Sequence, residues 1–226
     1  MGNLKYKLTD EVMIFNGRVL HRIEALKDFG DVKAGTKGGW IQHECNLSTT
    51  GNCWVYSQAK VMDNAFVFGD AIISGNAILD GNARAHDNCR VRGNAYINGN
   101  GTVYGNANVE MRAVITGYGM VGDNAIVRGK ACVQGDAIVA GSMVVDGTAI
   151  IGGCSSYYDY LYIFEGVYVD EPDLFRMQDD LNFEGIIYYS KDTKKVYIGA
   201  ESFSLDEFIE LGKTLHIEEF YTSLVN

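Results

Sequence analysis

Aliphatic residues recur at every sixth position across the middle of this chain, from Val55 to Ile151. The full series is Val55, Val61, Val67, Ile73, Leu79, Ala85, Val91, Ile97, Val103, Val109, Ile115, Val121, Val127, Val133, Val139, Val145 and Ile151. Four residues after most of them stands a small residue, usually Ala, often preceded by Gly-Asn or Gly-Asp. A fixed short period predicts a solenoid, whose coils cannot bury their apolar side alone and therefore stack.

Three such hexapeptides per triangular coil would place residues eighteen apart above one another. The seventeen aliphatic positions then give about six coils, with a length of about 29 Å at the usual strand spacing. Each aliphatic residue points inward and its predecessor outward, because strand side chains alternate. The Gly-Asn pairs are expected at the corners, where a positive φ costs Gly nothing and Asn little. The outward column Arg92, Glu110, Arg128 and Asp146 alternates in sign, as stacked neighbours prefer.

The rhythm divides the chain into three predicted regions. Residues 1–48 form a capping β segment, with a hairpin turning at Asn16-Gly17, a pair suited to a type I′ turn. Residues 49–153 form the solenoid. Residues 154–226 form a small α+β domain with strands near 160–164, 186–189 and 196–198, and a second helical segment near 218–224. Ser204 and Glu207 read as a capping box that opens a helix.

Charge separates the last region from the others. The chain has a net charge of −10; residues 1–154 hold 14 acidic and 14 basic side chains, whereas residues 155–226 hold 15 and 5. Nucleic acid is therefore an improbable partner, because binding to its phosphates needs a basic surface. With no apolar run long enough for a bilayer and no signal segment, we expect a cytoplasmic protein that does not enter a membrane. The five cysteines lack metal-binding spacing, so no metal site is predicted.

The repeated hexapeptide resembles the hexapeptide-repeat superfamily typified by UDP-N-acetylglucosamine acyltransferases. The lead-in to it, with Asp28–Gly35, Gly38-Gly39-Trp40-Ile41 and Gly51-Asn52-Cys53-Trp54-Val55, is similar to uncharacterised transferase-like proteins of bacteria and their phages. The resemblance implies a mainly β fold, a left-handed parallel β-helix, and a homotrimer. It implies no defined activity, because the narrower group has none firmly assigned.

The histidines depart from the superfamily pattern. Acyltransferases of this type place a catalytic histidine on or beside a loop that leaves the coils, yet the rhythm from Val55 to Ile151 never skips. The one solenoid histidine, His86, stands on an outward position between Arg84 and Asp87, where a plain surface role is the simpler interpretation. Carbonic anhydrases of the γ type need three metal-binding histidines, which four histidines with one in the solenoid do not supply.

Two further groups of residues are candidates for interactions. The outward column that follows Lys60 is largely apolar and is predicted to be the subunit interface of a trimer, with cover by the tail as the alternative. Its members are Ile78, Tyr96, Val114, Cys132 and Ile150. A tyrosine-rich cluster in the tail is a candidate partner-binding surface, with packing in a small core as the alternative. It contains Tyr157, Tyr158, Asp159 and Tyr160.

The leading functional prediction is a non-catalytic trimeric scaffold that needs no cofactor. Its acidic tail would bind a protein partner, and in a phage it would bind or inhibit a host protein. The alternative is an acyl-CoA-dependent acyltransferase, which would use acetyl-CoA or another acyl-CoA. Its site would lie between subunits, with His86 or His43 as the base.

Overall fold

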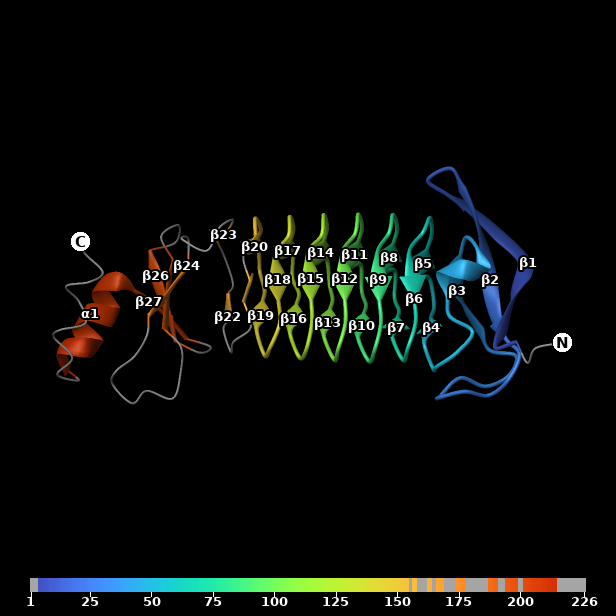
Figure 1. The fold of residues 1–226 in the computed structure, drawn as a ribbon, viewed down its shortest axis with the longest axis horizontal. Coiled ribbons are helices and arrows are strands. Elements are labelled where there is room, and N and C mark those ends of the chain that lie inside the picture. The colour runs from blue at the N-terminus through green and yellow to red at the C-terminus, as the bar shows by residue number, and fades with distance from the viewer. Residues whose placement is uncertain are drawn as a thin grey trace.

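A computed structural model describes residues 4–154, 156–157, 162–163, 166–168, 174–177, 187–190, 194–198 and 201–214. The predicted solenoid is confirmed: three parallel sheets form the sides of a prism, shown lengthwise in Figure 1. The pairing joins residues eighteen apart, for example Arg90 with Asn108 and Tyr96 with Val114. The architecture is that of a β-solenoid and is consistent with the hexapeptide-repeat left-handed β-helix.

The strands of the prism are short, most of them two residues long. The six-stranded sheet contains β6 (Phe66–Val67), β9 (Arg84–Ala85), β12 (Thr102–Val103), β15 (Met120–Val121), β18 (Ile138–Val139) and β21 (Ser156–Tyr157). The seven-stranded sheet contains β4 (Trp54–Val55), β7 (Ile72–Ile73), β10 (Arg90–Val91), β13 (Asn108–Val109), β16 (Ile126–Val127), β19 (Val144–Val145) and β22 (Tyr162–Ile163). The ten-stranded sheet contains β1 (Tyr6–Phe15), β2 (Arg18–Ala25), β3 (Lys37–Ile41), β5 (Lys60–Val61), β8 (Ile78–Leu79), β11 (Tyr96–Ile97), β14 (Val114–Ile115), β17 (Cys132–Val133), β20 (Ile150–Ile151) and β23 (Val167–Tyr168).

The prism has about seven coils, one more than the seventeen repeats predict. At the N-terminal end, β3 pairs in parallel with β5, and Leu47 bridges to Val67. At the other end, β21, β22 and β23 continue the three ladders beyond residue 153. The parallel sheets therefore cross both of the boundaries drawn from the sequence, although the division into three regions itself remains a prediction.

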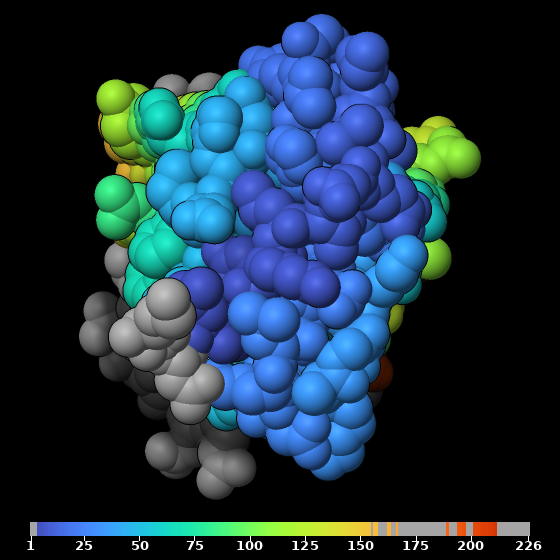
Figure 2. Space-filling model, turned by 90° about the vertical axis from the view of Figure 1, so that its right-hand side faces the viewer, coloured from blue at the N-terminus to red at the C-terminus, as the bar shows by residue number. Residues whose placement is uncertain are grey.

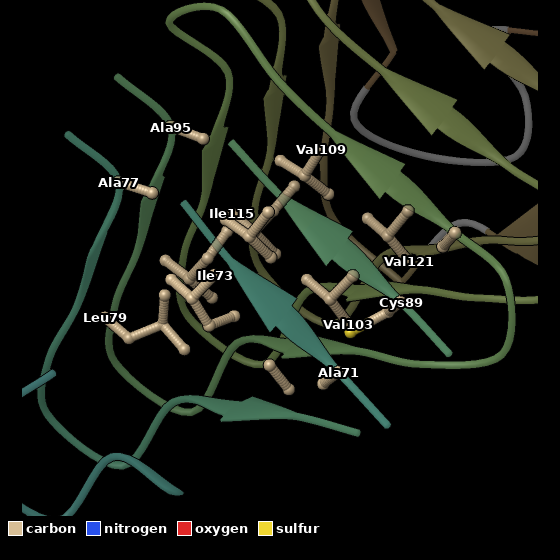
Figure 3. Close-up of a cluster of buried hydrophobic side chains, with 14 of the residues drawn as sticks. Ala71, Ile73, Ala77, Leu79, Cys89, Ala95, Val103, Val109, Ile115 and Val121 are labelled. Carbon is tan, nitrogen blue, oxygen red and sulfur yellow. The ribbon is translucent and has the colours of Figure 1, made fainter. Parts of the chain in front are cut away.

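The interior is a column of buried aliphatic and small side chains (Figure 3). Ile73, Ile97 and Val121 are fully buried, and so are the small residues of the next slot, such as Ala77 and Ala95. Both slots are narrow because three flat sides meet around one axis. The hexapeptide alternation of one branched and one small residue fills this space, which explains why the sequence keeps it.

Each corner turns through one residue with a positive φ, two positions after the inward aliphatic residue. This residue is mostly Gly, but five corners hold Ser57, Asp63, Asp87, Met111 or Asp123 instead. The sequence interpretation is corrected in one respect, because the corner asparagines do not adopt a positive φ. Their side-chain amides instead bond to one another from coil to coil. The bonded series are Asn64–Asn82–Asn100, Asn76–Asn94 and Asn88–Asn106–Asn124, at 3.0–3.3 Å.

The N-terminal segment covers one end of the prism, where residues of β1–β3 spread over the first coil in Figure 2. The predicted hairpin is confirmed, with φ of 48° at Asn16 and 75° at Gly17. Lys5 is 1% exposed, and its Nζ donates to the carbonyl oxygens of Cys53 at 2.6 Å and Ser48 at 3.3 Å. The open end is thus closed by satisfied backbone groups as well as by apolar cover.

The C-terminal strands form an antiparallel sheet of their own. It contains β24 (Leu174–Met177), β25 (Ile187–Ser190), β26 (Lys195–Ile198) and β27 (Glu201–Ser204), and it is followed by α1 (Leu205–Thr214). The capping box is confirmed: the backbone N–H of Ser204 donates to Glu207 Oε2 at 2.7 Å, and that of Glu207 to Ser204 Oγ at 3.2 Å. The segment near 218–224 lies outside the described residues. Within the described part of the chain, no helix is both long and apolar enough to cross a membrane.

Candidate functional site

His86 stands at the end of β9, on the outer face of the six-stranded sheet. Its imidazole is stacked between two rings, with centroids 4.7 Å from Phe68 and 5.8 Å from Tyr104. The planes differ by only 15° and 18°, so the three rings form one ladder along the prism axis. The side chain is 24% exposed, which leaves one edge open to solvent. His86 is therefore held far more firmly than a plain surface histidine, the simpler interpretation from the sequence.

Asp87 fixes the orientation of this imidazole. Its Oδ2 lies 3.1 Å from His86 Nδ1 and also accepts the backbone N–H of Gly105, one coil on, at 3.1 Å. The bond from Gly105, followed by the contact with His86, holds the pKa of the Asp87 carboxyl below its usual value. A carboxylate on Nδ1 retains the proton there and leaves the lone pair of a neutral imidazole on Nε2. This arrangement favours the neutral tautomer that a general base requires.

Asp87 can do this because of the corner on which it stands. It is one of the five non-glycine corner residues, with φ of 57°. Asp63 and Asp123 at equivalent corners make the same bond to the next coil, to the N–H groups of Gly81 and Gly141 at 3.3 and 3.0 Å. Asp is among the residues that tolerate this conformation, and here its short carboxylate accepts a backbone N–H of the next coil. The bond to the next coil therefore sets the carboxylate, and His86 docks against it.

Basic side chains flank this corner on both sides. Arg84 and Arg90 are exposed, and no ion pair within the described part of the chain engages either of them. Asp80 and Asp87, the acidic residues nearest to Arg84 in the sequence, form no ion pair with it. Arg92, in contrast, donates to Glu110 Oε2 at 2.6 Å, as the alternating column predicts, and Arg128 does the same to Asp146 at 2.6 Å. Arg84 precedes His86 on the six-stranded sheet, whereas Arg90 lies on the seven-stranded sheet beyond the corner, so the guanidinium group on the face of His86 that remains available to an anionic ligand is that of Arg84.

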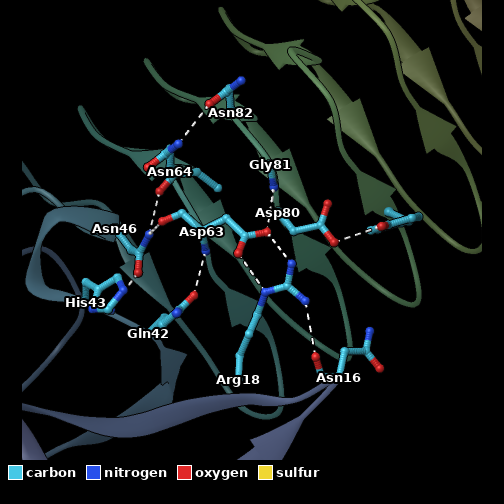
Figure 4. Close-up of polar contacts among 12 residues, drawn as sticks. Asn16, Arg18, Gln42, His43, Asn46, Asp63, Asn64, Asp80, Gly81 and Asn82 are labelled. Atoms are coloured by element: carbon cyan, nitrogen blue, oxygen red, sulfur yellow. Dashed lines mark hydrogen bonds and ion pairs between the residues drawn. The ribbon is translucent and has the colours of Figure 1, made fainter.

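His43, the second candidate base, belongs to the N-terminal cap instead. It precedes the short 3₁₀ helix η1 (Glu44–Asn46), and its backbone N–H donates to Asn46 Oδ1 at 2.7 Å. Asn46 in turn donates to the carbonyl oxygens of Asp63 and Ala65, both at 2.9 Å. Figure 4 shows this group beside the ion pair of Arg18 and Asp63. No contact within the described residues joins His43 to His86, and the surroundings of His43 are structural.

The predicted interface residues do form one column on the ten-stranded sheet, in the register 78–96–114–132–150. The N-terminal hairpin covers the start of this column. Ile78 packs against a cluster built on Leu20, Trp40 and Met62. Beyond the hairpin, Val114, Cys132 and Ile150 are half-buried within their own chain. The hairpin thus covers one end of the column, and both the role of the remainder as a subunit interface and its cover by the tail stay predictions.

The tyrosine-rich cluster is described at one position. Tyr157 lies in β21 with 5% of its surface exposed and packs in the core, so it offers little surface to a partner. It occupies the slot that Val139 fills one coil earlier. Tyr158, Asp159 and Tyr160 lie outside the described residues.

No group of three or more His, Cys, Asp or Glu side chains that could hold a metal occurs in the described part of the chain.

Sequence reasoning missed the neighbours of His86. Phe68 and Tyr104 are eighteen residues before and after it, so the stacking rule already predicted one column. The signal was an aromatic ring at each of three consecutive positions of that column. Gly122 and Ala140 continue it. This column consists of the residues that follow each aliphatic position, whereas the predicted interface column consists of those that precede it.

Comparison with known proteins gives one partial relative. No protein-family model matches the chain. A segment of 62 residues is 44% identical to a protein of Escherichia coli (strain K12) described as the uncharacterized acetyltransferase YdcK. The match covers 24% of this chain and 19% of that protein, so the chain is matched to about a fifth of the relative's length. The similarity is distant and partial.

Proposed function

We propose that the protein is an acyl-CoA-dependent acyltransferase in which His86 is the general base. The observation that carries the proposal is the pairing of His86 Nδ1 with the carboxylate of Asp87, on an imidazole held between two rings. A histidine whose second nitrogen is set by a carboxylate is the usual arrangement of a base that accepts a proton from a hydroxyl or an amine. The partial similarity to a protein described as an acetyltransferase supports this choice over a scaffold.

In the proposed reaction, Nε2 of His86 takes the proton of an acceptor hydroxyl or amine as its oxygen or nitrogen attacks the thioester carbonyl. The new ester or amide bond forms, the carbon–sulfur bond breaks, and the departing thiolate receives the proton back from the imidazolium. The carboxylate of Asp87 stabilises that imidazolium, and the faces of Phe68 and Tyr104 attract its positive charge. The exposed guanidinium group of Arg84, on the same sheet as His86, suits a phosphate of a coenzyme A donor.

The site also suits a position between subunits. His86 lies on a flat outer face, and the repeat never breaks to send a loop over it. Acyl transfer is favoured where water is excluded. A second copy of the chain that covers the six-stranded sheet would provide such a wall, while the apolar column of Val114, Cys132 and Ile150 lies on the ten-stranded sheet of the same prism. The homotrimer is therefore part of the proposal, and its mass in sedimentation equilibrium is the direct check.

The test compares binding with turnover in the full-length chain. Acetyl-CoA binding is measured by calorimetry, and transfer of a labelled acetyl group is measured with a panel of amino sugars and sugar alcohols. We expect His86→Gln to lower kcat by about 10²–10⁴-fold while acetyl-CoA still binds, because general-base catalysis contributes about that much. Asp87→Asn should give a partial loss, since Asn also adopts the corner conformation.

His43→Gln is the matched control, because His43 lies in the cap and should leave transfer unchanged. If neither acetyl-CoA nor any longer acyl-CoA binds the wild-type chain, the acyltransferase is refuted and the scaffold prediction becomes the better one. If acetyl transfer occurs but His86→Gln retains it, the assignment of the base is refuted.

A further inference from the structure

We infer that Tyr104, seated on Gly122, is a positioning residue that holds the His86 imidazole in its catalytic orientation. The inference rests on the proposed function, because it adds residues to the same site. Gly122 is then needed for the space that it leaves and not for its backbone conformation.

The column is continuous through four coils. The strands that precede its members pair in order: Phe66 with Arg84, Arg84 with Thr102, and Thr102 with Met120. The outward residues two positions later, Phe68, His86, Tyr104 and Gly122, therefore lie above one another. Phe68 is itself stacked on Phe66, with centroids 5.0 Å apart. The imidazole consequently has a fixed ring on one face and Tyr104 on the other.

Gly122 differs from the corner glycines. Its φ lies outside the positive range, so its backbone would accept any side chain. A Cβ built on Gly122 would overlap the ring atoms Cζ, Cε1 and Cε2 of Tyr104. The phenol ring therefore occupies the volume that a side chain at position 122 would fill. Position 122 also follows Tyr104 by one coil, as Tyr104 follows His86.

A ring clamped in this way limits how its neighbour can turn. Rotation of the His86 imidazole out of the ladder would require either Phe68 or Tyr104 to move, and Tyr104 rests against the backbone of Gly122. The stack thus keeps Nδ1 on Asp87 and Nε2 as the basic nitrogen. A small displacement of a catalytic group lowers the rate of the reaction strongly. Loss of the Tyr104 ring should therefore reduce turnover more than substrate affinity.

The experiment follows the four histidines of the chain by NMR in histidine-labelled full-length protein, with His86 assigned through His86→Gln. In Tyr104→Ala we expect the His86 ring resonances to shift and its nitrogens to report a mixture of tautomers. We expect kcat for acetyl transfer to fall about tenfold with an unchanged KM for acetyl-CoA. Tyr104→Phe, which keeps the ring, should restore both readouts.

Gly122→Ala should reproduce the effect of Tyr104→Ala, because the added methyl group displaces the phenol ring. The matched control is Gly152→Ala, whose Cβ would meet the side chain of Gln134 at 3.2 Å on a different side of the prism. Thermal melts check that all variants fold. If Gly122→Ala and Tyr104→Ala leave the His86 resonances and kcat as in the control, the inference is overturned. If the resonances move as expected but the wild-type chain transfers no acetyl group, the clamp stands and the acyltransferase proposal is refuted.

Discussion

Replacement of Met111 by Gly should stabilise the protein, although it removes a whole side chain. Met111 sits at a corner of the solenoid with φ of 62°, and 57% of its surface is exposed. A residue with a Cβ loses about 1–2 kcal/mol in this conformation. Gly loses more backbone entropy on folding, which costs about 0.5–1 kcal/mol. Little packing is lost at an exposed site, so the free energy of unfolding should rise by about 0.5–1 kcal/mol.

Urea unfolding followed by circular dichroism measures this change, and the melting temperature should rise by about 1–4 °C. The matched control is Tyr118→Gly, at a residue that is 64% exposed and has no positive φ. There the entropic cost of Gly acts alone and stability should fall by about 0.5–1 kcal/mol. The two substitutions are thus expected to have opposite signs. If both substitutions lower the stability, the positive φ of Met111 does not destabilise the protein as we expect.

Two further predictions concern the N-terminal cap. Lys5→Met should cost about 2–4 kcal/mol in urea unfolding, because it leaves the buried carbonyl oxygen of Cys53 without its charged donor and removes one of the two donors to the carbonyl oxygen of Ser48. Lys7→Met, at a half-exposed surface pair, is its control, and equal losses would refute the reasoning. The second prediction concerns Asp63, whose pKa is held below its reference value of 3.8 chiefly by hydrogen bonds from Arg18. The contribution of Asp63 to the free energy of unfolding is therefore present above about pH 4 and is lost as the pH falls through the lowered pKa. The stability advantage of wild type over Asp63→Asn should shrink on acidification. A pH-independent difference would contradict this.

The solenoid was predictable because a single rule, stacking at eighteen residues, follows from the period of the sequence. The same rule gave the Arg92–Glu110 pair, and local rules gave the Asn16-Gly17 turn and the capping box at Ser204. In each case the signal is carried by residues close in sequence or at a fixed spacing, so no knowledge of the wider packing is needed.

The ends of the solenoid were harder to predict because the six-residue repeat is irregular there. Tyr157 and Ile163 continue the six-residue spacing after Ile151, but an aromatic residue takes an aliphatic slot and the small residues disappear. At the start, Ile41 and Leu47 are also six apart, yet extra residues before Val55 change the pairing to twenty. A strict pattern search stops at such irregularities, whereas backbone hydrogen bonding tolerates them.

The environment of His86 was only partly accessible to sequence reasoning. The positions of Phe68 and Tyr104 follow from the stacking rule, but whether rings at those positions lie face to face depends on their side-chain torsions. The role of Asp87 depends on its positive φ, which the sequence pattern assigned to Gly and Asn. The carboxylate was therefore noted as a neighbour of the histidine and not as its partner.

The ladders between coils give the molecule a natural unit of length. Removal of eighteen consecutive residues from the uniform middle would shorten the prism by one layer and leave every remaining side chain on its original side. Removal of six would turn everything downstream by a third of a revolution, so that the surface carrying the rings would change sides relative to the capped end. Descendants of such a gene can therefore gain or lose whole layers freely, while any other change in length rearranges all three surfaces at once.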